Sequence, residues 1–294
     1  MAASEKTSKD FQIVDESFRQ VLRRDSAVRQ ICKNLGFTEG PVWMKSTKCL
    51  LFSDIPADTI YRWSQAGGMT VFRKPSHSAN GNAVDDQGRL VTCEHGSRTV
   101  TRTDKDGKVT TLSATHEGGK LNSPNDLAVK SDGTIWFTDP PYGLGRRKGE
   151  QKGNYVYRLD EGSGEPVAVA TDFDRPNGIC LSPDEKHVYI ADSGRGHHVR
   201  RFNVLKDNTL AGGKVFAVIR PGVPDGMRID AAGRLYSTAG DGVQVYNTAG
   251  ELIGKILTPK SAANCCFGGP DGRTLFITAR DGVYAVGLAV AGAR

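Results

Sequence analysis

The stretch GTIWFTD at residues 133–139 decides the fold, because its turn residue, apolar run and acidic end recur along the chain. The same form, with a small or acidic end, appears in KCLLFSD (48–54), GRLVTCE (88–94), KHVYIAD (186–192), GRLYSTA (233–239) and RTLFITA (273–279). The first apolar residues of the six copies in chain order, Leu50, Leu90, Ile135, Val188, Leu235 and Leu275, are separated by 40, 45, 53, 47 and 40 residues. Repeats of roughly 40–50 residues are typical of the four-stranded blades of a propeller. We therefore predict an all-β, six-bladed β-propeller.

The segments outside the six copies set the expected domain boundaries. Residues 34–294 are expected to form the propeller as a single domain, because strand-like runs such as TIYRWS and MTVFR fill the spaces between copies. Residues 1–33 stand outside the repeat, and the spacing of Phe18, Val21, Leu22 and Val28 predicts a short N-terminal helical arm. A two-domain α/β protein would need helical patterns of 10–15 residues between the strands, and none is found.

Composition excludes several classes of protein. The 294 residues are 38% hydrophobic with a mean hydropathy of −0.40, no run approaches the roughly 18 apolar residues of a membrane span, and the first residues are polar. These features predict a cytoplasmic protein with no membrane partner. The net charge of +6 comes from short basic groups without interleaved aromatic residues, which argues against nucleic acid as a partner. The six scattered cysteines are expected to be reduced core thiols. The oligomeric state stays open.

One polar residue opens the strand before each copy. Counting back 10 or 11 residues from the six apolar anchors leads to Glu39, Asn80, Asn125, Asn177, Asp225 and Asn264. The first strand of every propeller blade lines the central channel, so these side chains are expected to face the axis at one level. We call these six residues the ring. Asn-Gly and Asp-Gly pairs are also common turn formers. Turn chemistry does not explain a Glu before Gly-Pro at position 39 or an Asp after Pro at position 225.

A ring of oxygen-bearing side chains predicts a bound cation. Buried carboxylates are costly unless a positive charge compensates them, and hard divalent cations prefer oxygen ligands. Glu39 and Asp225 would supply two negative charges, while Asn125 and Asn177 would supply neutral carbonyl oxygens. The set fits one divalent metal, with Ca²⁺ favoured by the number of oxygens and Zn²⁺, Mg²⁺ or Mn²⁺ as alternatives. Asn80 and Asn264 are left to line the cavity.

The sequence resembles the family containing gluconolactonase, senescence marker protein (regucalcin) and luciferin-regenerating enzyme. The stretches that carry the resemblance are TEGPVW (38–43), LNSPNDLAV (121–129), RPNGICLSPDEKHVYIADS (175–193) and PDGMRIDAAGRLY (224–236). CEHGSRTVTR (93–102) and WFTDPPYG (136–143) are most similar to bacterial-type gluconolactonases. The resemblance implies a six-bladed propeller, a divalent metal and the hydrolysis of sugar lactones. It also implies Glu39, Asn177 and Asp225 as direct metal ligands, Asn125 as a ligand directly or through water, and Asp225 as the catalytic carboxylate.

The expected function is therefore the metal-dependent opening of a small lactone. Asp225 could activate water as a general base or attack the carbonyl itself, and the sequence leaves both routes open. His95, in CEHG, and Tyr142, in TDPPYG, are candidate substrate-binding residues together with Asn80, Asn125 and Asn264. Several sugar-lactonase relatives carry an arginine where this chain reads Asn122-Ser123-Pro124, which leaves the sugar open. The alternatives are a phosphotriesterase-type hydrolase on the same site and a non-catalytic calcium-binding propeller.

Overall fold

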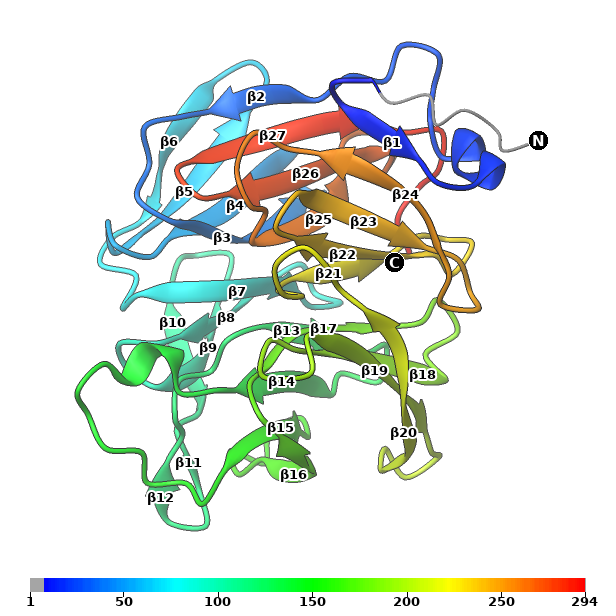
Figure 1. Ribbon diagram of the computed structural model, residues 1–294. Helices are drawn as coiled ribbons and strands as arrows, with labels where there is room; N and C mark the ends of the chain where they lie inside the picture. The colour runs from blue at the N-terminus through cyan, green and yellow to red at the C-terminus, as the bar shows by residue number, and fades with distance from the viewer. Residues whose placement is uncertain (1–7, 294) are drawn as a thin grey trace.

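Six antiparallel sheets, arranged as the blades of a propeller, make up the computed structural model, which describes residues 8–293 (Figure 1). The first blade contains β3 (Thr38–Met44), β4 (Cys49–Asp54), β5 (Thr59–Ser64) and β6 (Gly68–Arg73). The second contains β7 (Ala79–Val84), β8 (Leu90–Glu94), β9 (Thr99–Thr103) and β10 (Val109–Ser113). The third contains β13 (Leu127–Val129), β14 (Ile135–Asp139), β15 (Asn154–Leu159) and β16 (Val167–Phe173). The fourth contains β17 (Pro176–Leu181), β18 (His187–Asp192), β19 (His198–Val204) and β20 (Leu210–Val218). The fifth contains β21 (Met227–Ile229), β22 (Leu235–Ala239), β23 (Gly242–Tyr246) and β24 (Leu252–Leu257). The sixth contains β25 (Asn264–Gly268), β26 (Thr274–Ala279) and β27 (Gly282–Gly287). The predicted six-bladed propeller is confirmed.

The innermost strands close into a ring around the axis. Each packs against the innermost strand of the next blade, in the order β3, β7, β13, β17, β21 and β25, and β25 packs against β3 again. The apolar copies found in the sequence are the second strands of the blades, β4, β8, β14, β18, β22 and β26, and nearly all their residues are buried. Each blade therefore places its ring residue at or just before the start of its innermost strand.

The segment before residue 34 is built differently from the prediction. The expected helical arm is wrong for residues 8–33, because the only helical turn there is the 3-10 segment η1 (Glu16–Gln20). Strand β1 (Phe11–Ile13) pairs with β24, and β2 (Arg29–Cys32) pairs with β27 as the outermost strand of the sixth blade. Figure 1 shows β2 beside the C-terminal strand β27. Residues 1–7 and 294, which the predicted boundaries included, lie outside the described residues.

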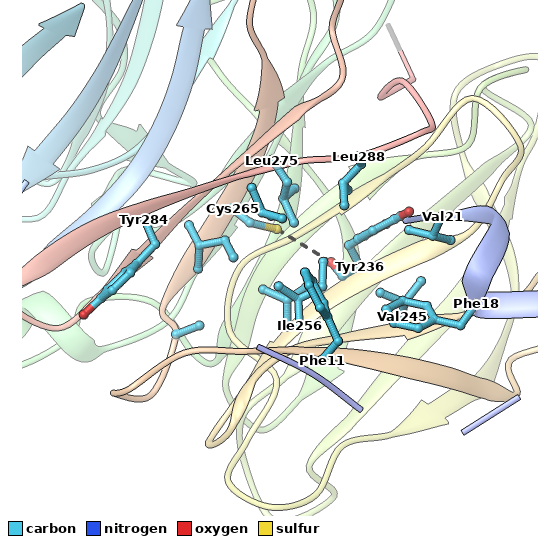
Figure 2. Close-up of a cluster of buried hydrophobic side chains, with 14 of the residues drawn as sticks. Phe11, Phe18, Val21, Tyr236, Val245, Ile256, Cys265, Leu275, Tyr284 and Leu288 are labelled. Carbon is cyan, nitrogen blue, oxygen red and sulfur yellow. Dashed lines mark hydrogen bonds between the residues drawn. The ribbon is translucent and has the colours of Figure 1, made fainter. Parts of the chain in front are cut away.

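The apolar residues that suggested a helix pack into the propeller instead. Phe11, Phe18 and Val21 are buried against Tyr236 and Val245 in one cluster between the fifth and sixth blades (Figure 2). Leu22 and Val28 pack against the same cluster and are partly buried. Their apolar character thus reflects burial against neighbouring sheets rather than a helical face.

Two further expectations concern the core and the membrane. All six cysteines are free and buried, as predicted. Within residues 8–293, no helix is long and apolar enough to span a membrane.

Two short elements lie in the loops of the second and third blades. The hairpin of β11 (Thr115–His116) and β12 (Gly119–Lys120) sits between the second and third blades in the chain, and the 3-10 turn η2 (Tyr142–Leu144) follows β14. The loop from β14 to β15 spans residues 140–153, whereas only residues 55–58 separate β4 from β5. The third blade therefore carries an extended loop at the end of the propeller where the innermost strands begin.

Candidate active site

Backbone contacts join neighbouring ring positions around the axis. The amide of Gly81 donates to Asn125 O at 2.8 Å, and the amide of Gly178 donates to Asp225 O at 3.1 Å. Ser53 Oγ, in the first blade, donates to Asn80 O in the second at 2.8 Å. In the same way, Thr138 Oγ1 in the third blade donates to Asn177 O in the fourth at 2.7 Å. These contacts hold the ring residues of adjacent blades next to each other.

Glycine follows four of the ring residues because the neighbouring blade leaves no room for a side chain. A Cβ atom on Gly40 would lie 1.9 Å from Asn80 O, and one on Gly178 would lie 2.2 Å from Asp225 O. Gly40 also has a φ of +50°, which a residue with a side chain rarely adopts. The Asn-Gly and Asp-Gly pairs of the sequence are thus inter-blade packing positions in addition to any turn they form.

An acidic residue at the end of the second strand fixes the loop that leads to the ring. Asp139 accepts hydrogen bonds from the backbone amides of Asn122 and Ser123, both at 2.7 Å, just before Asn125. The other two such aspartates do the same before Glu39 and Asn177: Asp54 binds the amides of Gly36 and Phe37, and Asp192 binds those of Asp174 and Arg175. Burial raises the pKa of Asp139 to about 7 despite these bonds.

Glu39, which is buried, and Asp225, which is partly accessible, form an interacting pair of carboxylates. Burial raises the pKa of Glu39 well above its usual range, and the negative charges of Asp225 and Asp126 raise it further. Burial, together with the charge of Asp126, also raises the pKa of Asp225 to about 7, and a hydrogen bond from Asn177 partly offsets this. The exposed fraction of Glu39 is 4%, whereas Asp225 is partly accessible. The two acids therefore repel each other in a place where water does little to screen them.

Of the other two predicted ligands, Asn177 lies within hydrogen-bonding reach of Asp225. Asn125 and Asn177 are both buried at 6% exposure. Asn177 Nδ2 donates to Ser193 Oγ at 3.0 Å, and no hydrogen bond to Asn177 Oδ1 is found within residues 8–293. Within the same residues, no group of three or more His, Cys, Asp or Glu side chains forms a metal site, and the ring differs from such groups in combining two acids with carboxamides.

A second layer of polar residues lies around the axis beneath the acids. Asp126, in the third blade, lies 3.5 Å from Arg228 Nη1 in the fifth blade and accepts a 3.4 Å hydrogen bond from Asn264 Nδ2 in the sixth. Asn264 Oδ1 accepts the backbone amide of Cys265 at 2.8 Å, which leaves mainly the nitrogen of Asn264 for other partners. Three blades are thus connected by one buried charged network.

Asn80 and His95 form a buried polar pair within the second blade. Asn80 Nδ2 donates to His95 Nε2 at 3.1 Å, and the exposed fractions of the two residues are 3% and 7%. Burial lowers the pKa of His95 to about 4, and the positive charge of Arg147 adds to this effect, so the imidazole is neutral. Asn80 Oδ1 is buried without a hydrogen-bond partner among the described residues. A buried acceptor without a partner is costly, and it is satisfied when a ligand supplies the donor.

Tyr142 borders the site from the extended loop of the third blade. The pKa of Tyr142 is raised, mainly by burial. Hydrogen bonds with Ser193 and Asn177 oppose this rise, and the negative charge of Asp225 adds to it. The exposed fraction of Tyr142 is 40%, so its side chain also faces solvent. Arg147 secures the loop by donating to the carbonyl oxygens of His95 and Gly96 at 3.1 and 2.9 Å.

Sequence reasoning missed three residues at this end of the propeller: Ser193, Arg175 and Arg280. Ser193 accepts a hydrogen bond from the Asn177 side chain and donates one to Pro224 O, just before Asp225. Arg175 lies beside Tyr142. The positive charge of Arg280 lowers the pKa of Asp225. The signal for Arg175 was its place two residues before a ring position. A separate surface cavity of about 470 Å³ between the second and third blades contains no ring residue.

Comparisons with known proteins identify a family and agree with the observed fold. The family profile described as SMP-30/Gluconolactonase/LRE-like region matches residues 37–281. The chain is 32% identical to a gluconolactonase of Zymomonas mobilis subsp. mobilis, covering 90% of this chain and 82% of that protein. It is 28% identical to regucalcin of Bos taurus, covering 85% of each. A solved gluconolactonase structure from Xanthomonas campestris is 35% identical, with a TM-score of 0.91 and 98% of both chains covered.

Proposed function

The chain belongs to the SMP-30/gluconolactonase/LRE-like family, and we propose that it is a lactonase that opens a small lactone in the channel bordered by the ring. The observation that carries the proposal is the pair of carboxylates, Glu39 and Asp225: burial of Glu39 and the negative charge of Asp225 together raise the pKa of Glu39. Relatives named as gluconolactonases cover most of the chain. They support the hydrolysis of a lactone ester as the reaction class.

Glu39, Asn125, Asn177 and Asp225 are proposed to hold one divalent cation. The donor set consists of oxygens only, with two negative charges and two neutral amides, which suits Ca²⁺ and leaves Zn²⁺, Mg²⁺ or Mn²⁺ as alternatives. A bound dication offsets the repulsion between the two acids. When bound, it would polarise the lactone carbonyl and stabilise the negative charge that develops on its oxygen.

Asp225 is proposed as the general base. Its carboxylate is the more accessible of the two acids and can orient a water molecule and accept its proton. The water oxygen bonds to the carbonyl carbon, and the C–O bond within the lactone breaks. The proton that Asp225 took from the water then passes to the departing alkoxide oxygen. The product is an open-chain hydroxy acid, which ionises to its carboxylate. Direct attack by Asp225 through an anhydride is the competing route.

Five residues are proposed to bind the substrate: Asn80, His95, Asn125, Tyr142 and Asn264. The Asn80 oxygen, buried without a partner, is suited to accept a hydrogen bond from a substrate hydroxyl. His95 would keep that oxygen oriented through its bond to the Asn80 nitrogen, and Tyr142 would cover the substrate at the solvent side. Asn125 and Asn264 would contact the substrate from the third and sixth blades. A polyhydroxylated lactone meets these needs.

Proton release from D-glucono-δ-lactone and from simple γ-lactones tests the proposal. The protein is treated with a chelator, reloaded with Ca²⁺, and compared with Asp225→Asn and with Asp271→Asn, which changes an exposed aspartate in a turn of the sixth blade. Loss of turnover on chelation, its return with metal, and a loss of about a thousandfold in kcat/KM for Asp225→Asn alone are expected. Full activity of Asp225→Asn would refute the assigned role.

Two outcomes would replace the proposal. Turnover of paraoxon or diisopropyl fluorophosphate without lactone turnover would assign a phosphotriesterase. Metal binding that raises the melting temperature, with no turnover of either class, would assign a non-catalytic calcium-binding propeller.

A further inference from the structure

Two arginines stand beside the site with their guanidinium groups over aromatic rings. Arg175 Cζ lies 5.8 Å from the centroid of the Tyr142 ring, and Arg280 Cζ lies 5.4 Å from that of Phe37. Both arginines are exposed. Stacking holds the flat face of a guanidinium group and leaves its edge of N–H donors free.

Both arginines lie within electrostatic reach of the ring. Arg280 follows β26, and its carbonyl oxygen accepts hydrogen bonds from Thr38 N at 2.7 Å and Thr38 Oγ1 at 3.0 Å, next to Glu39. Arg175 lies over Tyr142 and stands two residues before the ring residue Asn177. The two guanidinium groups therefore approach the channel from the fourth and sixth blades.

Neither charge is neutralised by an ion pair within residues 8–293. The acidic residues adjacent in the chain are engaged elsewhere: Asp174 Oδ2 accepts the backbone amide of Arg195, and Asp281 is paired with Lys260 at 2.6 Å. Asp126 is paired with Arg228 below the ring.

The balance of charge beside the channel is positive once the two acids of the ring are compensated. A dication would offset Glu39 and Asp225, and the two stacked arginines would then remain. Their free N–H edges match the paired oxygens of a carboxylate or phosphate. A neutral sugar lactone would leave both groups without an anionic partner.

We infer that Arg175 and Arg280 bind an anionic substituent of the substrate, so the preferred lactone carries a carboxylate or a phosphate away from the ester that is opened. This inference rests on the proposed lactonase function and specifies its substrate class. The two arginines are assigned to specificity and take no part in the bond changes.

The test compares lactones that differ in charge. Proton release is measured with D-glucono-δ-lactone, which is neutral, with D-glucaro-γ-lactone, which carries a carboxylate, and with gluconolactone phosphorylated on its terminal hydroxymethyl group. The variants are Arg175→Gln, Arg280→Gln and the double variant. Arg29→Gln is the control, because Arg29 is exposed on the outermost strand of the sixth blade.

We expect kcat/KM for one anionic lactone to exceed that for the neutral lactone by about tenfold or more, and each variant to lose most of this ratio through KM. The preference should also shrink as NaCl rises from about 20 mM to about 300 mM, since salt screens exposed charges. The carboxylate and phosphate arms identify which anion is recognised. Equal rates for charged and neutral lactones, or equal losses for both in the variants, would overturn the inference while leaving the lactonase intact.

Product binding separates this result from failure of the enzyme activity. The shift in melting temperature with D-glucarate, which has two carboxylates, is compared with that for D-gluconate, which has one. A larger shift with glucarate that is lost in the double variant supports the anion site even without turnover. Equal shifts in the native protein and the double variant would overturn it.

Discussion

Asn80 Nδ2 donates a hydrogen bond to His95 Nε2 at 3.1 Å, and this bond turns the Asn80 oxygen away from the imidazole. That oxygen has no partner among the described residues. We therefore expect His95, besides any contact of its own with the substrate, to position the Asn80 oxygen.

Replacing His95 by Phe should release the Asn80 amide. We expect KM for a sugar lactone to rise about tenfold with a smaller fall in kcat, because one oriented hydrogen bond is lost. Asn80→Ala should have a similar effect, and the double variant should be little worse than either single one, since both changes remove the same interaction. His77→Phe, at an exposed neighbouring histidine, is the control. Independent, additive losses would contradict the coupling.

Chelation should make stability depend on pH in a defined direction. Burial and the charge of Asp126 raise the pKa of Asp225 to about 7 from a usual value of 3.8, so the folded state binds a proton that the unfolded chain releases earlier. Stability contributed by that proton is present below the unfolded pKa and is lost as pH rises toward about 7. The melting temperature of chelated protein should therefore fall as pH rises from about 4 to about 7, and Ca²⁺ should restore more at the higher pH. Asp225→Asn should reduce this dependence; an unchanged pH profile in that variant would refute the assignment.

Gly178 should not tolerate a side chain. A Cβ atom there would lie 2.2 Å from Asp225 O, so Gly178→Ala must push two blades apart. We expect a loss of about 3 kcal/mol in the free energy of unfolding together with reduced turnover. Gly287→Ala is the matched control, because the atom nearest to a Cβ at that position would be Arg23 Nη1, at an ordinary contact distance of 3.6 Å. Chemical denaturation of both variants decides the matter, and equal stabilities would show that the blades yield easily.

Asp139→Asn should loosen the loop before Asn125. Asp139 now accepts hydrogen bonds from two backbone amides at 2.7 Å, and in the variant the side-chain NH₂ group would face at least one of these donors. We expect a loss of about 2 kcal/mol in the free energy of unfolding. Turnover should fall as well, because the loop leads to Asn125. Asp85→Asn provides the comparison: Asp85 accepts the amides of Gln87 and Arg89 in a turn at the opposite end of its blade. That variant should lose stability and keep its KM.

Phe18→Ala should weaken the fold without changing the site. Phe18 is fully buried against the fifth blade, and Gly254 lies directly beside its ring. The cavity left behind should cost about 3–5 kcal/mol in the free energy of unfolding. KM for the lactone should stay the same at temperatures where the variant is folded. A changed KM would mean that the N-terminal segment reaches the substrate.

The propeller could be predicted because its repeat is local. Each copy keeps its turn, its apolar run and its distance from the polar residue one strand earlier, so six blades and six ring positions follow from the residues alone. The role of the acidic residue at the strand end was missed, although Asp54 and Asp139 follow their ring residues by 15 and 14 positions. Its partners are backbone amides, which leave no mark on the sequence.

The N-terminal segment could not be predicted for a different reason. Strand β1 has only three residues, and β2 is largely exposed, so neither shows an alternating pattern. Their partners, β24 and β27, lie more than two hundred positions further along the chain. Phe18 and Val21 were apolar because another part of the chain covers them. Arg175 and Arg280 were missed because the nearness of Arg175 to Tyr142 and of Arg280 to Asp225 arises only when the blades close.

The pairing of β2 with β27 also sets the order in which the protein can be completed during synthesis. Residues 29–32 leave the ribosome early and have no partner strand until residues 282–287 have been made. Throughout that interval the early strand presents unpaired backbone groups that could join another nascent chain. We therefore expect this segment to need protection by chaperones, and the yield to depend on translation speed, because the sixth blade is complete only after β27 has been synthesised.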